Sequence, residues 1–139
     1  MDTLTLRLLT ALALVGLGLL AYAAYGQFTV RRAQNKRLGL ESARPGVPAI
    51  LYFTTPSCVP CRTAQGPAIE RLTAALGDAL QVIKIDAQEQ PDVADHWGVL
   101  SVPTTFVIDR SGKPRFFNAG VAQVDKLEKQ LLQAGLQPR

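Results

Sequence analysis

Hydrophobic positions divide this chain into one long uninterrupted stretch and several short ones. The long stretch runs over Leu8–Val30 and contains no charged residue. As a helix at ~1.5 Å per residue it covers about 34 Å, which exceeds the ~30 Å of a membrane hydrocarbon core. Tyr22, Tyr25 and Phe28 gather at its end, where aromatic rings suit a membrane–water interface. We therefore expect residues 1–30 to form a single membrane anchor.

A cleaved signal peptide is the alternative for the same stretch. Ala21–Ala23 reads AYA and resembles a small-residue cleavage site, and Arg7 can serve as the charged region before it. However, the uncharged run exceeds the ~7–15 residues usual for a signal peptide. A buried core helix is disfavoured, because so small a domain can hardly surround a helix that is apolar on every side. We favour an uncleaved anchor.

Short apolar runs beyond the anchor predict four strands. Residues 31–46 form a polar linker ending in ARPGVP, whose prolines and glycine stop a helix. Residues 47–139 then have room for one small domain. AILYFT (49–54) is typical of a strand buried on both faces, and LQVIKID (80–86) is a second strand. TTFVID and PRFFNA follow, joined by RSGK, whose length and glycine suit an antiparallel hairpin.

Helical spacing appears in three places between and after these strands. Ile69, Leu72 and Leu76 share one face of a helix, and Gly77 provides its C-terminal stop. PDVADHWG opens with a proline suited to a first helical turn, and VDKLEKQLLQAG (124–135) carries an apolar stripe. The order β-α-β-α-β-β-α predicts an α/β domain with a four-stranded mixed sheet flanked by helices.

The distribution of charge along the chain indicates which kinds of partner it can bind. Residues 1–40 carry five basic side chains against one acidic, whereas residues 41–139 carry ten of each. The basic character therefore belongs to the stretch beside the anchor, which is typical of a topology and lipid-headgroup signal. The domain itself lacks the charge of a nucleic-acid-binding surface, and we expect no nucleic-acid partner.

The two cysteines of the chain, Cys58 and Cys61, lie three positions apart in TTPSCVPCRTAQGP. Cys58 falls between a strand and a helix, where unpaired N–H groups and the helix dipole favour a nucleophilic thiolate. Pro60 tolerates the first helical turn and stiffens the loop. A structural staple is disfavoured because so short a loop removes little entropy from the unfolded chain. A zinc site would need about four ligands, and only His96 could be added. A copper-type thiolate site, a metal site shared between chains and chance spacing stay open.

A proline far along the chain bears on the same question. Pro103 follows Val102 and directly precedes the third predicted strand. Such a proline can adopt the cis peptide, which would leave the backbone of Val102 free to pair with an extended peptide. An ordinary trans proline at the start of a strand is equally compatible with the residues.

The segment Ala49–Leu136 resembles the thioredoxin superfamily. The resemblance rests on CVPC after LYF, IKID closing the second strand, WGVLSVPT, the DRSGKP hairpin and Gly120. It implies that Cys58 attacks a substrate disulfide and that Cys61 resolves the mixed disulfide. The residues implied to contact substrate are Val59, Pro60, Val102, Pro103 and Gly120.

The sequence departs from the superfamily pattern at several positions. Ser57 stands where a tryptophan is usual, and Val59 replaces a glycine between the cysteines. Tyr52 occupies the place of a buried acid that accepts a proton from the resolving thiol, and Val82 falls near the place of its lysine. The segment before Pro67 is one residue longer. Proton transfer from Cys61 must therefore rely on water or on the substrate.

By this resemblance the chain is a membrane-tethered thiol–disulfide oxidoreductase. Proline before the second cysteine favours a reductase of protein disulfides, with no metal or organic cofactor beyond the Cys58–Cys61 disulfide. The partners implied are protein disulfide substrates and an upstream thiol electron donor, and we expect a monomer. The alternative is a non-catalytic binding module of the same fold, for a protein partner or a copper-type metal ion.

Two indications disagree about the side of the membrane. Four basic residues follow the anchor and one precedes it, which favours a cytosolic domain by the positive-inside rule. The resemblance favours the opposite side, because single-anchor relatives in bacteria usually work outside the cytoplasmic membrane. An oxidising compartment is also where a tethered reductant has substrates. We expect a single-pass protein of the cytoplasmic membrane with an extracytoplasmic domain, and the cytosolic face stays open.

Overall fold

The computed structural model describes residues 2–33 and 38–137. Its elements run in the order that the hydrophobic pattern predicts, after one long N-terminal helix. They are α1 (Thr3–Ala33), β1 (Ala49–Thr54), a π-helical turn (Cys61–Gln65), α2 (Gly66–Leu76), a 3-10 turn (Gly77–Ala79), β2 (Gln81–Asp86), α3 (Pro91–His96), β3 (Thr104–Ile108), β4 (Pro114–Ala119) and α4 (Val124–Gln133).

The four strands form one mixed sheet in the order β2-β1-β3-β4, which confirms the expected fold class. β1 pairs parallel with β2 through the α2 crossover, and antiparallel with β3. β3 and β4 form the predicted hairpin. All six residues of β1 are buried, as expected for a central strand covered on both faces.

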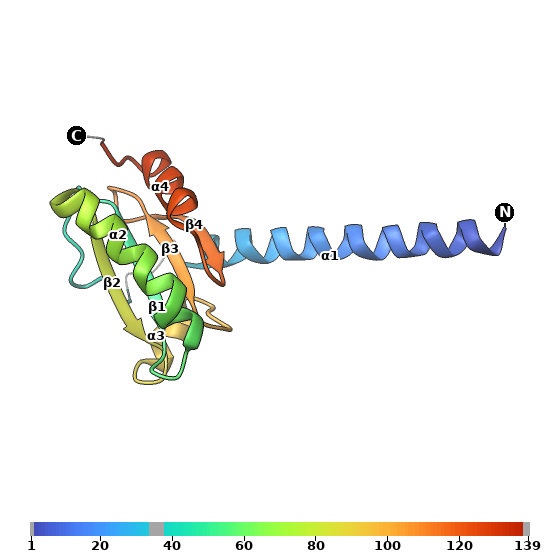
Figure 1. Ribbon diagram of the computed structural model, residues 1–139, viewed down its shortest axis with the longest axis horizontal. Coiled ribbons are helices and arrows are strands. Elements are labelled where there is room, and N and C mark those ends of the chain that lie inside the picture. The colour runs from blue at the N-terminus through green and yellow to red at the C-terminus, as the bar shows by residue number, and fades with distance from the viewer. Residues whose placement is uncertain (1, 34–37, 138–139) are drawn as a thin grey trace.

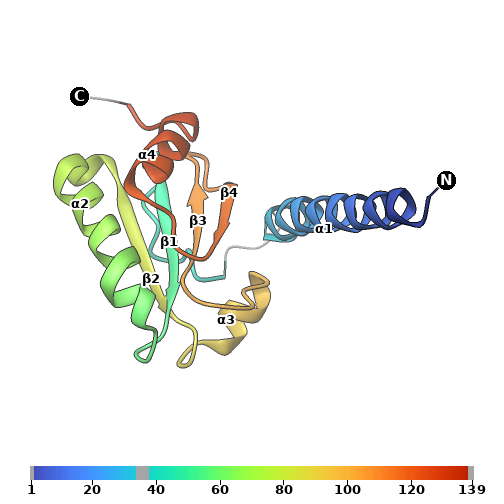
Figure 2. The same ribbon diagram turned by 45° about the vertical axis from the view of Figure 1, so that its right-hand side comes forward.

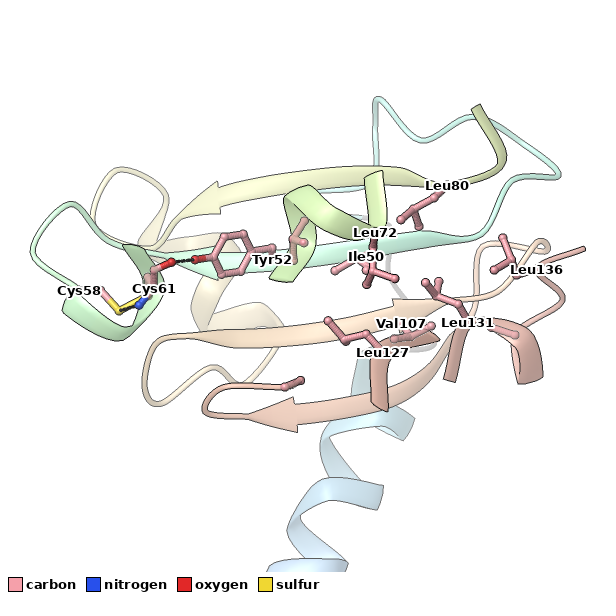
Figure 3. Close-up of a cluster of buried hydrophobic side chains, with 13 residues drawn as sticks. Ile50, Tyr52, Cys58, Cys61, Leu72, Leu80, Val107, Leu127, Leu131 and Leu136 are labelled. Carbon is pink, nitrogen blue, oxygen red and sulfur yellow. Dashed lines mark hydrogen bonds between the residues drawn. A yellow bond between two sulfur atoms is a disulfide. The ribbon is translucent and has the colours of Figure 1, made fainter. Parts of the chain in front are cut away.

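Alternating side chains of β1 serve two different cores. Ile50 and Tyr52 face a mainly aliphatic cluster that α2 and α4 supply with Ile69, Leu72 and Leu127 among others. Figure 3 shows this cluster, which also contains both cysteines. We call it the redox core.

The opposite face of the sheet is covered by α3 and is rich in aromatic rings. Phe53, Trp97 and Phe106 are at most 1% exposed, and their rings meet edge to face. The Trp97 and Phe106 ring centroids lie 4.8 Å apart, and the Trp97 indole N–H donates to the Leu38 carbonyl at 2.7 Å. We call this second cluster the aromatic core. Figure 2 shows α2 on one side of the sheet and α3 on the other.

Helix α1 projects away from the sheet, as Figure 1 shows, and its leucines are exposed. Its length and composition suffice to cross a membrane, a test that a signal sequence also passes. The helix continues to Ala33, three residues beyond the expected end of the anchor at residue 30. Arginine is a good helix former, so the basic residues after Val30 extend the helix rather than end it.

The last turns of α1 pack against β4 and the turn after α3. The Tyr25 hydroxyl donates to the Gly98 carbonyl at 2.8 Å, and the Tyr25 ring meets Phe117 edge to face at 5.7 Å. Thr29 is 3% exposed. The helix before Tyr25 is still about 33 Å long at ~1.5 Å per residue, enough for a ~30 Å hydrocarbon core. The end of α1 is therefore part of the domain as well as of the helix that could span a membrane.

Candidate redox site

The two cysteines lie where β1 passes into the helical segment that leads to α2. They form a disulfide with a sulfur–sulfur distance of 2.02 Å and Cα atoms 5.3 Å apart. Helical residues begin at Val59, so Cys58 stands at the N-terminus of this segment. The Cys61 N–H donates to the Cys58 sulfur at 3.2 Å. Cys58 is 8% exposed and Cys61 only 1%, so Cys58 is the more accessible of the two cysteines.

The extra residue before Pro67 is absorbed in the π-helical turn Cys61–Gln65. In this turn the Gly66 N–H donates to the Cys61 carbonyl, five residues back. A π turn contains one residue more than an α-helical turn, so it accommodates the extra residue without interrupting the helical segment. A Cβ at Gly66 would lie 2.9 Å from the Cys61 oxygen, so the turn requires glycine there.

Tyr52 lies beneath the disulfide, at the position where the superfamily pattern has an acid. Its hydroxyl donates to the Cys61 carbonyl at 3.3 Å, a long bond that Figure 3 shows. Burial raises the pKa of Tyr52 above its ordinary value of 10.0, and a hydrogen bond with Thr54 opposes the rise only in part. The hydroxyl therefore stays protonated at neutral pH and is no base for the Cys61 thiol.

A solvent groove reaches Cys61 from the β2 side. Tyr52, Glu70 and Lys84 are among its lining residues. Lys84, rather than Val82, is the direct register partner of Tyr52 in the β1–β2 ladder. The sequence comparison missed Lys84 because the pairing register of two distant strands is not visible in their residues. Cys61 is itself among the residues that line this groove.

The peptide bond between Val102 and Pro103 is cis. The Pro103 carbonyl accepts a hydrogen bond from the Gly120 N–H at 2.8 Å, which ties the loop before β3 to the end of β4. Val102 packs against both cores, including the redox core that contains the cysteines. A Cβ at Gly120 would meet no atom within 4 Å. Glycine is favoured there because of the backbone conformation, with a φ of 85°, and not for lack of space.

Exposed apolar side chains lie in three segments that contain or adjoin the predicted site residues. Val59 is 56% exposed, Leu100 82% and Val121 37%, and Pro60 is exposed as well. The three side chains come from the cysteine segment, the loop before Pro103 and the loop after Gly120. Of these, Leu100 and Val121 were not among the predicted site residues.

Gln65 is a further residue that the sequence reasoning missed. It is fully buried, at 0% exposure, at the end of the π-helical turn. Its side-chain oxygen accepts the Ala122 N–H at 2.7 Å, and its side-chain nitrogen donates to the Ala122 carbonyl at 3.1 Å. The only signal in the sequence was the extra residue before Pro67, which does not indicate where Gln65 points.

The thiols of Cys58 and Cys61 are bonded to each other, so neither is free in this structure to hold a metal ion. Within residues 2–33 and 38–137, no three His, Cys, Asp or Glu side chains are gathered as metal ligands would be.

Comparison with known proteins adds to this geometry. A family model described as thioredoxin matches residues 40–133. Thioredoxin from Bacillus subtilis (strain 168) is 39% identical over 56 residues, which cover 40% of this chain and 53% of that protein. Thioredoxin 1 from Synechococcus elongatus is 32% identical over 78 residues, covering 56% of this chain and 69% of that protein. The chain thus matches about half of the first relative's length and about two thirds of the second's.

Solved structures agree with the family match. A mutant thioredoxin from Halobacterium salinarum superposes with a TM-score of 0.61 at 22% identity, over 76% of this chain and 89% of that one. A thioredoxin from Nicotiana alata superposes with a TM-score of 0.58 at 31% identity, over 70% of this chain and 81% of that one. At 22% identity the first likeness shows the fold alone.

Proposed function

The chain belongs to the thioredoxin family, and from that premise we propose that it is a membrane-tethered reductase of protein disulfides. Family membership and the cysteine pair support thiol–disulfide oxidoreductase activity in general. The observation that carries the finer proposal is the placement of the disulfide. The more exposed cysteine, Cys58, stands at a helix N-terminus, and the less exposed Cys61 lies one turn further along.

Cys58 is the proposed nucleophile. In the reduced protein its thiolate is stabilised by the N–H groups at the start of the helical segment, of which the Cys61 N–H already points at the sulfur. The thiolate attacks one sulfur of a substrate disulfide. A mixed disulfide forms on Cys58, and the first substrate thiolate leaves and takes up a proton.

Cys61 is the proposed resolving thiol. After losing its proton it attacks the Cys58 sulfur, re-forms the Cys58–Cys61 disulfide and releases the second substrate thiolate. Two electrons pass from the dithiol to the substrate, and no cofactor beyond the cysteine pair takes part. Because Tyr52 cannot accept the Cys61 proton, water in the groove beside Glu70 and Lys84 or the departing substrate thiolate receives it.

The substrate is proposed to lie across the loops beside the disulfide. The Val102 backbone at the cis peptide can pair with an extended segment, and the open space at Gly120 allows its backbone to approach. Val59 and Pro60 supply apolar contact next to the reacting sulfur. An upstream thiol donor is proposed to reduce the resulting disulfide by the same exchange in reverse, with the chain acting as a monomer.

Residues 1–30 are proposed to remain as a single-pass anchor in the cytoplasmic membrane, with residues 31–46 as linker and 47–139 as the thioredoxin-like domain. The length and apolar composition of α1 support the anchor. We place the domain on the extracytoplasmic side, where protein disulfides are abundant.

Trapping of substrates tests the reductase proposal. Full-length Cys61→Ser, produced in membranes, should accumulate mixed disulfides because its Cys58 attacks but nothing resolves the product. Cys58→Ser is the matched control and should trap far less, since its remaining thiol is buried. Equal trapping by both variants, or none by either, would contradict the assigned roles and favour a binding module.

Labelling of intact cells tests the side of the membrane. Cys58 and Cys61 are the only thiols in the chain. A membrane-impermeant reductant followed by an impermeant maleimide should therefore shift the mass of the protein before lysis if the domain is extracytoplasmic. A shift seen only after lysis would place the domain in the cytosol.

A further inference from the structure

The buried side chain of Gln65 joins two parts of the redox site that are distant in sequence. On one side it belongs to the π-helical turn that begins at Cys61. On the other side its amide holds both backbone groups of Ala122, at 2.7 Å and 3.1 Å. This two-bond pattern is the one by which neighbouring strands exchange hydrogen bonds, here made by a single side chain.

Ala122 leads directly to the loop proposed to contact substrate. Two residues earlier, the Gly120 N–H donates to the Pro103 carbonyl at 2.8 Å. Between them lies Val121, 37% exposed, whereas Ala122 is 1% exposed. The three-residue segment 120–122 is therefore held at one end by the cis-proline loop and at the other by Gln65.

Among side chains of this length, only that of glutamine can pair with both the N–H and the carbonyl of Ala122. The Ala122 backbone presents a donor and an acceptor, and the carboxamide offers the complementary acceptor and donor. Leucine has a similar volume and would leave both Ala122 groups buried without partners. Glutamate keeps an acceptor for the N–H but lacks the donor for the carbonyl.

We propose that Gln65 is a positioning residue, which sets the substrate-contacting segment 120–122 and the Val102–Pro103 loop relative to the Cys58–Cys61 disulfide. This proposal rests on the proposed function and deepens it. Both hydrogen bonds of the Gln65 amide go to Ala122 and not to a cysteine, so it acts on the docking of a protein substrate and not on the exchange step. The one-residue extension before Pro67 serves this role, because it creates the turn that directs Gln65 inward.

The test compares Gln65→Leu with Gln130→Leu in the full-length chain in detergent micelles. Gln130 also makes two side-chain amide bonds, at 2.9 and 3.0 Å, but their partner Asn118 is not a proposed substrate-contacting residue. Each reduced protein is assayed with insulin as the protein disulfide and with 5,5′-dithiobis-(2-nitrobenzoic acid) as a small disulfide.

Gln65→Leu should lower kcat/KM for insulin about tenfold or more, mainly through KM, while the rate with the small disulfide stays within about twofold. Gln130→Leu should leave the ratio of the two rates unchanged. A parallel fall of both rates in Gln65→Leu, or no fall in either, would overturn the positioning role. If Gln65→Leu does not fold, Gln65→Glu serves in its place, with a smaller loss expected because it keeps the bond to the Ala122 N–H.

Failure of the proposed function is recognised separately. If the wild-type chain reacts with the small disulfide but not with insulin, the reductase proposal fails, and Gln65 is judged by hydrogen exchange at the Ala122 amide. That amide should lose protection in Gln65→Leu and keep it in Gln130→Leu. Retained protection in Gln65→Leu would show that Gln65 does not hold the segment.

Discussion

The two faces of the sheet differ in what their side chains are used for. The redox core places aliphatic residues and Tyr52 around a disulfide, whereas the aromatic core packs rings against one another and continues through Phe117 to Tyr25 of α1. Neighbouring residues of β1, such as Tyr52 and Phe53, enter opposite cores. The sheet thus separates the disulfide on one face from the contacts of α1 on the other. Substitutions in the aromatic core should therefore change stability without changing the redox equilibrium of the cysteine pair.

The largest expected effect comes from Cys58→Ser on the redox face. Disulfide exchange with insulin should be abolished, because the more exposed nucleophile is lost. The fold should survive, since closing a loop of so few residues contributes at most about 2 kcal/mol. Turnover is measured with the full chain, and stability by denaturant unfolding of the oxidised wild type and the variant. Residual turnover near the wild-type rate would remove Cys58 from its assigned role.

On the aromatic face, Trp97→Ala should act on stability and spare the redox equilibrium. The side chain is 1% exposed and packs on Phe106, so its removal should cost about 3–5 kcal/mol of unfolding free energy. The equilibrium of the cysteine pair with a thiol buffer should not move. Phe106→Leu is the milder variant if Trp97→Ala does not fold. A clear change in the redox equilibrium in either would break the separation of the two faces.

Asp109, in the turn between β3 and β4, should make the stability of the fold depend on pH. Burial would raise the pKa of Asp109, but hydrogen bonds from Ser111, from the Lys113 N–H and from Arg115 lower it to about 2. Because the folded-state pKa lies below the ordinary 3.8, the carboxylate stabilises the fold above about pH 4 and loses this contribution toward pH 2.

A shift of that size corresponds to about 2 kcal/mol. Unfolding free energy is measured from about pH 2 to about pH 5, the range in which the carboxylate titrates in the folded and unfolded states. Asp109→Asn should remove this part of the slope, and the same change at exposed Asp78 should leave it in place. An unchanged slope in Asp109→Asn would refute the assignment.

The smallest effect is expected where the aromatic face meets α1. Tyr25→Phe removes the bond to the Gly98 carbonyl but keeps the ring against Phe117, so it should cost about 1 kcal/mol. Tyr22→Phe is the matched control on the same helix, since Tyr22 is 63% exposed and should change nothing. Thermal unfolding in detergent micelles measures both. Equal behaviour of the two variants would indicate that the end of α1 does not dock on the domain.

Local patterns in the sequence were enough to predict the strands, the hairpin and the main helices. The run Ala49–Thr54 shows no alternation of apolar and polar residues, which is typical of a strand buried on both faces, and it forms the fully buried strand β1. Gly77 ends α2 with a φ of 52°, as its place after the last apolar position predicted. Such features depend on neighbouring residues alone.

Contacts between distant segments were not predictable in the same way. The pairing of Tyr52 with Lys84 depends on strand register, and the reach of Gln65 to Ala122 depends on the phase of a π-helical turn. The docking of Tyr25 on Gly98 joins residues 73 positions apart, and an aromatic at the end of an apolar run equally suits a membrane interface. In each case the residue type was visible but its partner was not.

The central claim is that Cys58 and Cys61 form a couple that opens and closes while passing electrons to a protein disulfide. The most direct measurement mixes the fully reduced full-length chain with excess insulin and counts the thiols on each protein by maleimide mass shift over time. The chain should lose two thiols as it re-forms its own disulfide, while insulin gains two in step. A chain that keeps both thiols while insulin stays oxidised would contradict the claim.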